Sequence, residues 1–191
     1  ESYVLCEIST ARDDPALRGL LEASLEQAMT DGIVLDAVLA QSLAQRAALW
    51  KLRESVPEAQ RTEGASIKHD ISVPVASLQR FLELATHAAG QLVPGVRVVA
   101  FGHLGDGNAH FNLTQPAGAD GVAFLARWEE ISRQVHELAI GLGGSFSAEH
   151  GIGALKVREL AHWRGGVPLE VMRAVKMALD PLGIMNPGKL F

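Results

Sequence analysis

The stretch "FGHLGDGNAH", residues 101–110, places two histidines on either side of a short turn motif. The dipeptide Asp106-Gly107 is typical of the tight turn of a β-hairpin. With these two residues at the centre of the turn, His103 pairs with His110. Directly opposed residues of an antiparallel pair have Cβ atoms ~4.5–5.5 Å apart on one face of the sheet. The stretch therefore predicts a hairpin that presents two imidazoles side by side.

The same register sorts the remaining side chains of the hairpin into two faces. Asn112 and Thr114 share the face of the histidines, because side chains alternate along a strand. The opposite face is apolar and is predicted to belong to the core; it carries Val98, Ala100, Leu104, Phe111 and Leu113. One face of the hairpin is thus structural, and the other is available for chemistry.

Two imidazoles at facing positions can share one metal ion, and a catalytic zinc site usually has a third protein ligand. The candidate lies in "GGSFSAEHGIG", residues 143–153. There the Glu149 carboxylate fits a third ligand, and His150 fits a general base, because imidazole has an unperturbed pKa of about 6.5. Two alternatives remain at this point. The histidines can be polar residues on a solvated sheet face, and Glu149 can cap the start of a helix.

The rest of the chain shows helical and strand periodicity in turn. Strands are expected at 3–9, 33–36, 66–73, 96–104 and 108–114. Helices are expected at 13–29, 38–54, 75–90, 119–142, 154–161 and 168–179. Strands alternate with helices at first and a hairpin follows, which favours an α+β fold: an antiparallel-rich mixed sheet flanked by helices.

Composition narrows the function classes. The 191 residues are 48% hydrophobic and 20% charged, which is typical of a globular domain. The net charge of −5 and the absence of a basic run argue against nucleic acid as a partner. The longest apolar stretches fall short of the ~20 residues of a membrane span. No secretory signal opens the chain. The lone Cys6, which we expect in the core, suits a reducing compartment. A cytoplasmic location is therefore expected.

Three motifs carry a resemblance to a known family. In order, "FGHLGDGNAHFNL", "SAEHGIGALK" and "DPLGIMNPGKLF" resemble the C-terminal half of FAD-linked D-2-hydroxy-acid dehydrogenases. That group contains D-lactate dehydrogenase, D-2-hydroxyglutarate dehydrogenase and the flavin subunit of glycolate oxidase. The resemblance implies a ferredoxin-like cap (substrate) domain made of residues 1–191 as a single domain. Because a separate N-terminal domain binds most of the FAD in such enzymes, it also implies that this chain is a fragment, inactive alone.

The resemblance assigns roles to individual residues. It makes His150 the base that takes the hydroxyl proton, and Asn186 a tail residue that reaches the flavin. The residues that match the ligands of a divalent metal, with zinc the expected ion, are His103, His110 and Glu149. The residues that match substrate contacts are Arg53, Lys68 and Asn112. Pro57 stands where some members have a further polar substrate contact, so the particular 2-hydroxy acid is not indicated.

Each of these roles has a structural alternative. Arg53 can simply end its helix favourably against the helix dipole. Lys68 can be solvated on a strand face, and the tail can pack as a C-terminal arm. His69, His87, His136 and His162 are interpreted as structural or surface residues.

Three functions follow as hypotheses. The first is the cap domain of an FAD-dependent dehydrogenase that oxidises a D-2-hydroxy acid to the 2-oxo acid. The second is a self-contained zinc hydrolase that uses His103, His110 and Glu149. The third is a non-catalytic interaction module. The "NPGK" motif favours the first. Its expected partners are the small hydroxy acid, its own flavin domain, an electron acceptor that the sequence does not identify, and a second copy of the chain in a homodimer.

Overall fold

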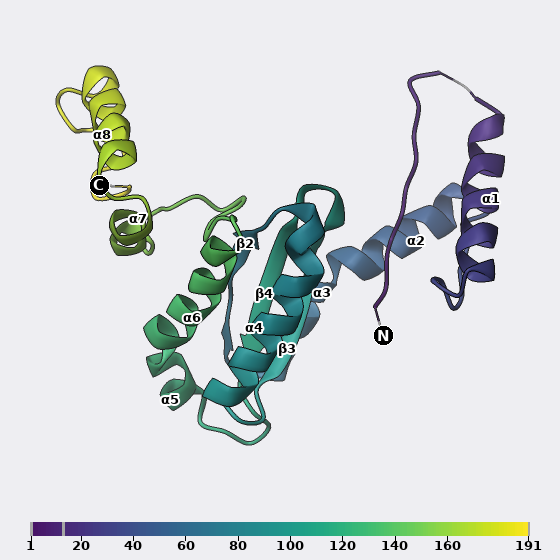
Figure 1. The fold of residues 1–191 in the computed structure, drawn as a ribbon, viewed down its shortest axis with the longest axis horizontal. Helices are drawn as coiled ribbons and strands as arrows, with labels where there is room; N and C mark the ends of the chain where they lie inside the picture. The colour runs from purple at the N-terminus through teal and green to yellow at the C-terminus, as the bar shows by residue number, and fades with distance from the viewer. Residues whose placement is uncertain (1, 13, 191) are drawn as a thin grey trace. The chain divides into compact units, whose positions relative to one another are not determined.

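The computed structural model describes residues 2–12 and 14–190 (Figure 1). The chain divides into two compact units, Glu1–Thr62 and Glu63–Phe191. Within the described ranges, no helix is both long enough and apolar enough to cross a membrane.

The first unit is helical. It contains α1 (Ala16–Thr30), α2 (Leu43–Glu54) and the short α3 (Val56–Ala59). The strands expected at 3–9 and 33–36 are wrong, because neither segment has a partner strand in the described residues. Instead the Glu7 carboxylate accepts hydrogen bonds from Arg46 (2.6 Å) and Trp50 (2.6 Å) of α2. Cys6, expected in the core, is exposed.

The second unit is built on an antiparallel sheet with β4 (Asn108–Thr114) at its centre. β3 (Arg97–His103) pairs with one edge of β4, and β1 (Ser66–Ile67) and β2 (Asp70–Ser72) pair with the other. The register is the same on both sides of the break between β1 and β2, so the two act as one interrupted strand. Together with its helices, this sheet confirms the α+β class.

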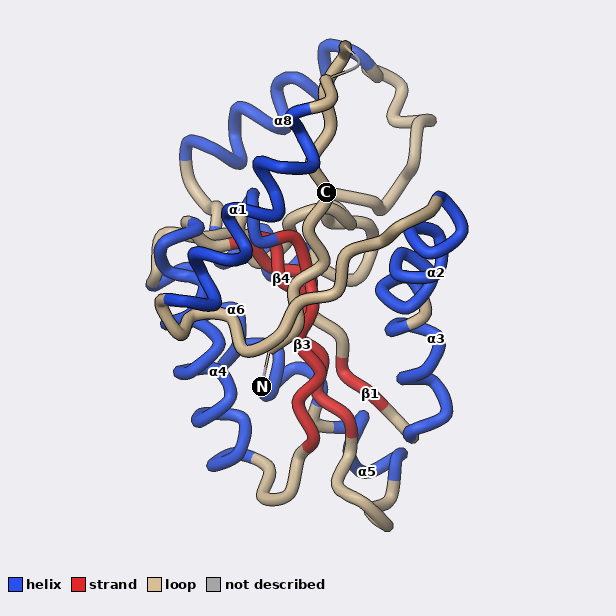
Figure 2. Tube along the Cα trace, turned by 90° about the vertical axis from the view of Figure 1, so that its right-hand side faces the viewer, coloured by secondary structure: helices blue, strands red, loops and turns tan. Residues whose placement is uncertain are grey.

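Two helices cover the apolar face of the sheet (Figure 1). They are α4 (Leu78–Leu92), preceded by a 3₁₀ turn at Val75–Ser77, and α6 (Trp128–Gly141). The core between them and the sheet includes Ile71, Phe81, Ala85, Phe111, Leu113, Ile131 and Val135. The long helix expected at 119–142 is divided at Arg127 into α5 (Gly121–Ala126) and α6. The last two helices of the described residues are α7 (Val157–Trp163) and α8 (Val167–Leu179), both labelled in Figure 1. Figure 2 shows α8 from a second direction.

The hairpin has a different register from the expected one. His103 lies opposite Asn108, and His110 lies opposite Phe101. The reason is that the turn is longer: a 3₁₀ turn at Leu104–Asp106 is followed by Gly107, whose φ is 72°. The shift moves the pairing by two residues, and because the side-chain period of a strand is also two, both histidines stay on one face.

The predicted core face of the hairpin is confirmed in part. Phe111 and Leu113 are fully buried, and Val98 packs against the core. Ala100 lies opposite Phe111, on the predicted face, but it is not buried, and Leu104 lies outside the strand. Leu104 lies in the turn and is 59% exposed, and Ala100 is exposed on β3, which pairs only with β4 in the described sheet.

After α6 the chain returns along the free edge of β2. Ser72 N–H donates to Ser145 O (3.0 Å), and Ser145 N–H donates to Ser72 O (2.8 Å). Gly144 permits this approach, since a Cβ there would lie 2.0 Å from Ser72 O. The residues from 143 to 151, here called the return loop, thereby reach the polar face of the sheet.

Two of the histidines interpreted as structural are buried between the sheet and α6. The His69 ring donates through Nδ1 to Phe111 O (2.7 Å) and accepts at Nε2 from the Ser132 hydroxyl (3.1 Å). The His136 ring meets it edge-on with centroids 5.5 Å apart, and His136 Nδ1 lies against the Glu159 carboxylate. Burial lowers the pKa of His69 to about 3, so the ring stays neutral.

We expect Gly144→Ala to lower the free energy of unfolding by roughly 1–3 kcal/mol, because the added methyl group overpacks against Ser72 O and Val73. Gly141→Ala is the matched control. Gly141 is the last residue of α6 and has open space around its would-be Cβ, so this change should be neutral or slightly stabilising. Urea denaturation measures both. Equal stability of the two variants would contradict the close packing of the return loop.

The buried His69 predicts a loss of stability in acid. Its pKa is about 3 when folded and near 6.5 when unfolded, so between these values the unfolded state binds the extra proton. The free energy of unfolding should therefore fall as the pH drops from 6.5 towards 3, by at most about 1.4 kcal/mol per pH unit from this residue. Denaturation at several pH values should show a shallower fall for His69→Gln. His87 is exposed, so His87→Gln is the control and should keep the wild-type dependence of unfolding free energy on pH. The same pH dependence in wild type and His69→Gln would refute the lowered pKa of His69.

Candidate metal and substrate site

The carboxylate of Glu149 lies between the two histidines of the hairpin. His103, at the end of β3, places Nδ1 2.9 Å from Glu149 Oε1. His110, in β4, places Nε2 3.8 Å from Glu149 Oε2. Two imidazole nitrogens and one carboxylate thus converge, and this donor set is one that zinc accepts in catalytic sites.

The structure also answers the alternatives raised for these residues. Glu149 does not cap a helix, since α7 begins only at Val157 and has no side-chain cap. The side chain of His110 is 15% exposed, unlike a histidine on a solvated face. His103 is more open, with 54% of its side chain exposed.

His150 lies beside His110 at the end of the return loop. The two rings stack with centroids 5.5 Å apart and an interplanar angle of 29°. The His150 side chain is 65% exposed. A ring in this position can exchange a proton with a small molecule bound at the histidine cluster.

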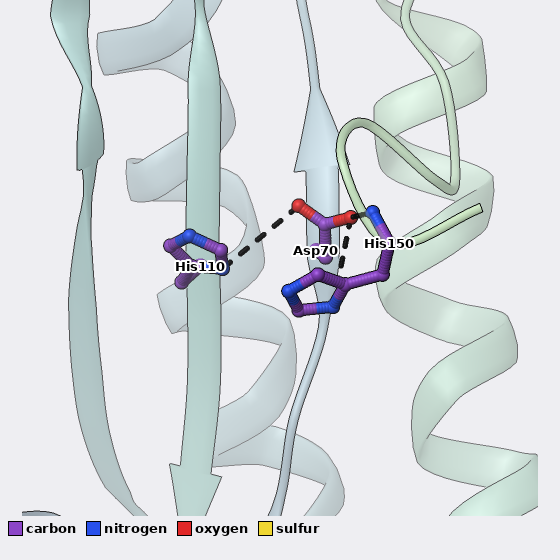
Figure 3. Close-up of side chains that lie close together, drawn as sticks. All are labelled: Asp70, His110 and His150. Carbon is purple, nitrogen blue, oxygen red and sulfur yellow. Dashed lines mark hydrogen bonds and ion pairs between the residues drawn. The ribbon is translucent and has the colours of Figure 1, made fainter. Parts of the chain in front are cut away.

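Asp70 is the one central residue of this site that the sequence reasoning missed. It is directly opposite His110 in the register of β2 and β4, and its side chain is 2% exposed. Figure 3 shows its carboxylate between the two rings, with Oδ1 3.8 Å from His110 Nδ1 and Oδ2 3.7 Å from His150 Nδ1. Nitrogen and oxygen atoms of Asp70, His110 and His150 lie within 4.8 Å of one another.

The Asp70 carboxylate is held by hydrogen bonds from several directions. Oδ2 accepts the backbone N–H groups of Ala148 (3.2 Å), Glu149 (2.8 Å) and His150 (2.8 Å), and Oδ1 accepts Asn108 Nδ2 (3.0 Å). Burial raises the pKa of Asp70, but the N–H groups of His150 and Glu149, together with Asn108, outweigh it and lower the pKa below its usual value. The group is therefore ionised at neutral pH.

The polar face continues from His110 towards the predicted substrate contacts. Asn112 lies on the same face of β4 and is buried. The register of β1 and β2 with β4 places the exposed Lys68 opposite Asn112. An amide and a cation thus lie on the same face of the sheet as His110.

The other two predicted residues lie elsewhere in the chain. Arg53 is in the last turn of α2, in the first unit, where a cation also favours the helix end. Asn186 has a φ of 50° and lines an open hollow in the C-terminal tail with Lys176 and Lys189. Within the described residues, the second unit brings together His103, His110, Glu149 and His150. The register of β1 and β2 with β4 places Lys68 and Asn112 on the same face.

Comparisons with known proteins give the family. The model of the family "FAD linked oxidases, C-terminal domain" matches residues 1–190. Proteins named D-2-hydroxyglutarate dehydrogenase are similar to this chain. The one from Stutzerimonas stutzeri is 39% identical over 99% of the chain. Those from Bos taurus and Arabidopsis thaliana are 38% and 35% identical, each over 98% of the chain. The chain spans 40%, 33% and 32% of the lengths of these three relatives, respectively. The chain therefore belongs to the C-terminal domain family of the FAD-linked oxidases.

Proposed function

We propose that this chain is the substrate- and metal-binding part of an FAD-dependent oxidoreductase that converts a D-2-hydroxy acid to the 2-oxo acid. The observation that carries the proposal is the position of Glu149 between His103 and His110, with His150 beside them. The relatives named above share one activity in their names, so D-2-hydroxyglutarate is the first substrate to test.

The metal assignment rests on the chemistry of the donor set. His103, His110 and Glu149 would hold a divalent ion, for which zinc fits two imidazoles and a carboxylate. When bound, the ion would supply Lewis acidity at the substrate hydroxyl, and the flavin would supply an acceptor for hydride. Asp70, whose carboxylate accepts hydrogen bonds from the return loop and from Asn108, is not assigned to this ligand set.

The remaining residues bind the substrate and move its proton. Lys68 attracts the substrate carboxylate as a point charge, and Asn112 offers a hydrogen bond beside it. Arg53 would grip the carboxylate with two parallel hydrogen bonds; this role and the flavin contact of Asn186 rest on the family resemblance alone. His150 takes the hydroxyl proton as the adjacent carbon gives up hydride, so that alcohol becomes ketone.

The zinc assignment predicts about one zinc ion per chain after incubation with zinc and desalting. Replacing one of three ligands removes a coordination bond, so His110→Ala should bind zinc at least tenfold more weakly. Elemental mass spectrometry gives the stoichiometry, and competition with a chromophoric chelator gives the affinity. His87→Ala, which removes an exposed imidazole from α4, should leave both values unchanged. Zinc bound equally by wild type and His110→Ala would refute this ligand set.

The substrate assignment predicts that the zinc-loaded chain binds D-2-hydroxyglutarate more tightly than its L enantiomer. Lys68→Gln should weaken this binding roughly tenfold, or about 1.4 kcal/mol, because it removes a charge-assisted contact to the carboxylate. Calorimetric titration measures the affinity. Arg80→Gln, which removes a cation from the exposed face of α4, is the control and should not change it. Ester hydrolysis by the zinc-loaded chain without flavin would instead support the hydrolase hypothesis.

A further inference from the structure

We propose that Asp70 is a positioning residue, whose buried carboxylate fixes the return loop so that Glu149 and His150 face His110. Its meaning for catalysis rests on the proposed function, but its effect on the loop does not. Asp70 supplies no substrate contact; it acts through the two residues whose backbone it holds.

The geometry of the loop carries this inference. Three consecutive backbone N–H groups, those of Ala148, Glu149 and His150, converge on the single oxygen Oδ2 at 3.2, 2.8 and 2.8 Å. Successive N–H groups that point inward form a concave site for an anion. Here that anion is a side chain of the sheet, so the loop is anchored to the strand that pairs with His110.

The second oxygen anchors the same carboxylate to β4. Oδ1 accepts Asn108 Nδ2 at 3.0 Å, two residues before His110 on the same face. Three of the four hydrogen bonds that reach this carboxylate end on Oδ2, so the oxygen that faces the loop is fully engaged. The nearest imidazole nitrogens, at 3.7 and 3.8 Å, are beyond hydrogen-bond distance. The hydrogen bonds therefore make this carboxylate a scaffold that joins the loop to the sheet.

The three amides do not depend equally on the carboxylate. Ala148 N–H also donates to the backbone oxygen of Asp70 at 3.2 Å, a bond that survives any substitution of the side chain. Glu149 and His150 have Oδ2 as their N–H acceptor in the described structure. These two are also the residues whose side chains are assigned as ligand and base. Loss of the carboxylate should therefore expose the amides of Glu149 and His150 to exchange more than the amide of Ala148.

Residue-resolved amide hydrogen exchange by NMR on the whole chain tests this selectivity. In Asp70→Ala, exchange at Glu149 and His150 should accelerate at least tenfold, and exchange at Ala148 should accelerate less. Amides of β4 and α4 should keep their wild-type rates. Zinc affinity, measured by chelator competition, should fall 10–100-fold, as it does when a group that orients ligands is removed. Asp70→Asn keeps one oxygen towards the loop, so it should give intermediate rates.

Asp180 offers a matched control. Its buried carboxylate accepts the N–H groups of Ile184 (3.0 Å) and Met185 (2.9 Å) in the tail. Asp180→Ala should accelerate amide exchange at Ile184 and Met185. It should change neither the amide exchange of Glu149 and His150 nor the affinity for zinc.

The outcomes separate this proposal from the proposed function. Unchanged amide exchange at Glu149 and His150 in both Asp70 variants overturns the positioning role. A weaker zinc affinity without faster exchange in the loop also overturns it, because that result identifies Asp70 as a ligand. Faster amide exchange throughout the sheet also overturns the positioning role, because it shows that the substitution destabilises the whole unit. If Asp70→Ala does not fold, the exchange rates of Asp70→Asn test the proposal. A wild-type chain that binds no zinc refutes the metal part of the proposed function, while selective exchange in the variants still supports the anchor.

Discussion

The pairing of β4 with the strands on its two edges is the constraint on which the second unit depends. Side chains alternate along β4, so each step of its register assigns one residue to the core and the next to the polar face. Ala109, Phe111 and Leu113 are buried in the core cluster that α4 and α6 complete. Asn108, His110 and Asn112 occupy the other face. The packing of the core and the placement of the site are therefore set by one pattern, and a slip of a single residue would exchange them.

The site is completed by a segment distant in sequence from the hairpin. The return loop reaches the hairpin face because Ser145 pairs with the free edge of β2 and Gly144 leaves room for the backbone of Ser72. From there, Asp70 holds the next turn of the loop. A flexible loop would deliver Glu149 and His150 to many positions, whereas an anchored one holds them in one arrangement before anything binds. Preorganisation of this kind reduces the free energy that binding must spend on ordering.

The sequence predicted the helices, the hairpin and the face of each histidine better than it predicted the turn. Face assignment depends on a period of two, so it survived a register error of two residues at His103 and His110. The turn itself depended on how Leu104 and Gly107 fold locally, which the Asp-Gly pair did not reveal. The strand expected at 3–9 failed because alternation indicates a strand only where a partner exists. Asp70 lies in a segment that was expected to form a strand, but its role arises from contacts with residues about 80 positions away, and no local pattern contains them.

The charges of the cluster provide an independent argument for a cation. Asp70 is ionised and 2% exposed, and Glu149 lies beside the same imidazole from the opposite direction. Asp70 and Glu149 thus bring two carboxylates to one imidazole, and Asp70 does so in a buried place, where repulsion between like charges is stronger than in water. Hydrogen bonds from the loop offset the charge of Asp70, whereas the half-exposed Glu149 carboxylate faces the imidazoles of His103 and His110. A divalent ion at Glu149 would balance both carboxylates, and it would leave Lys68 free to attract an anionic substrate to the same face of the sheet.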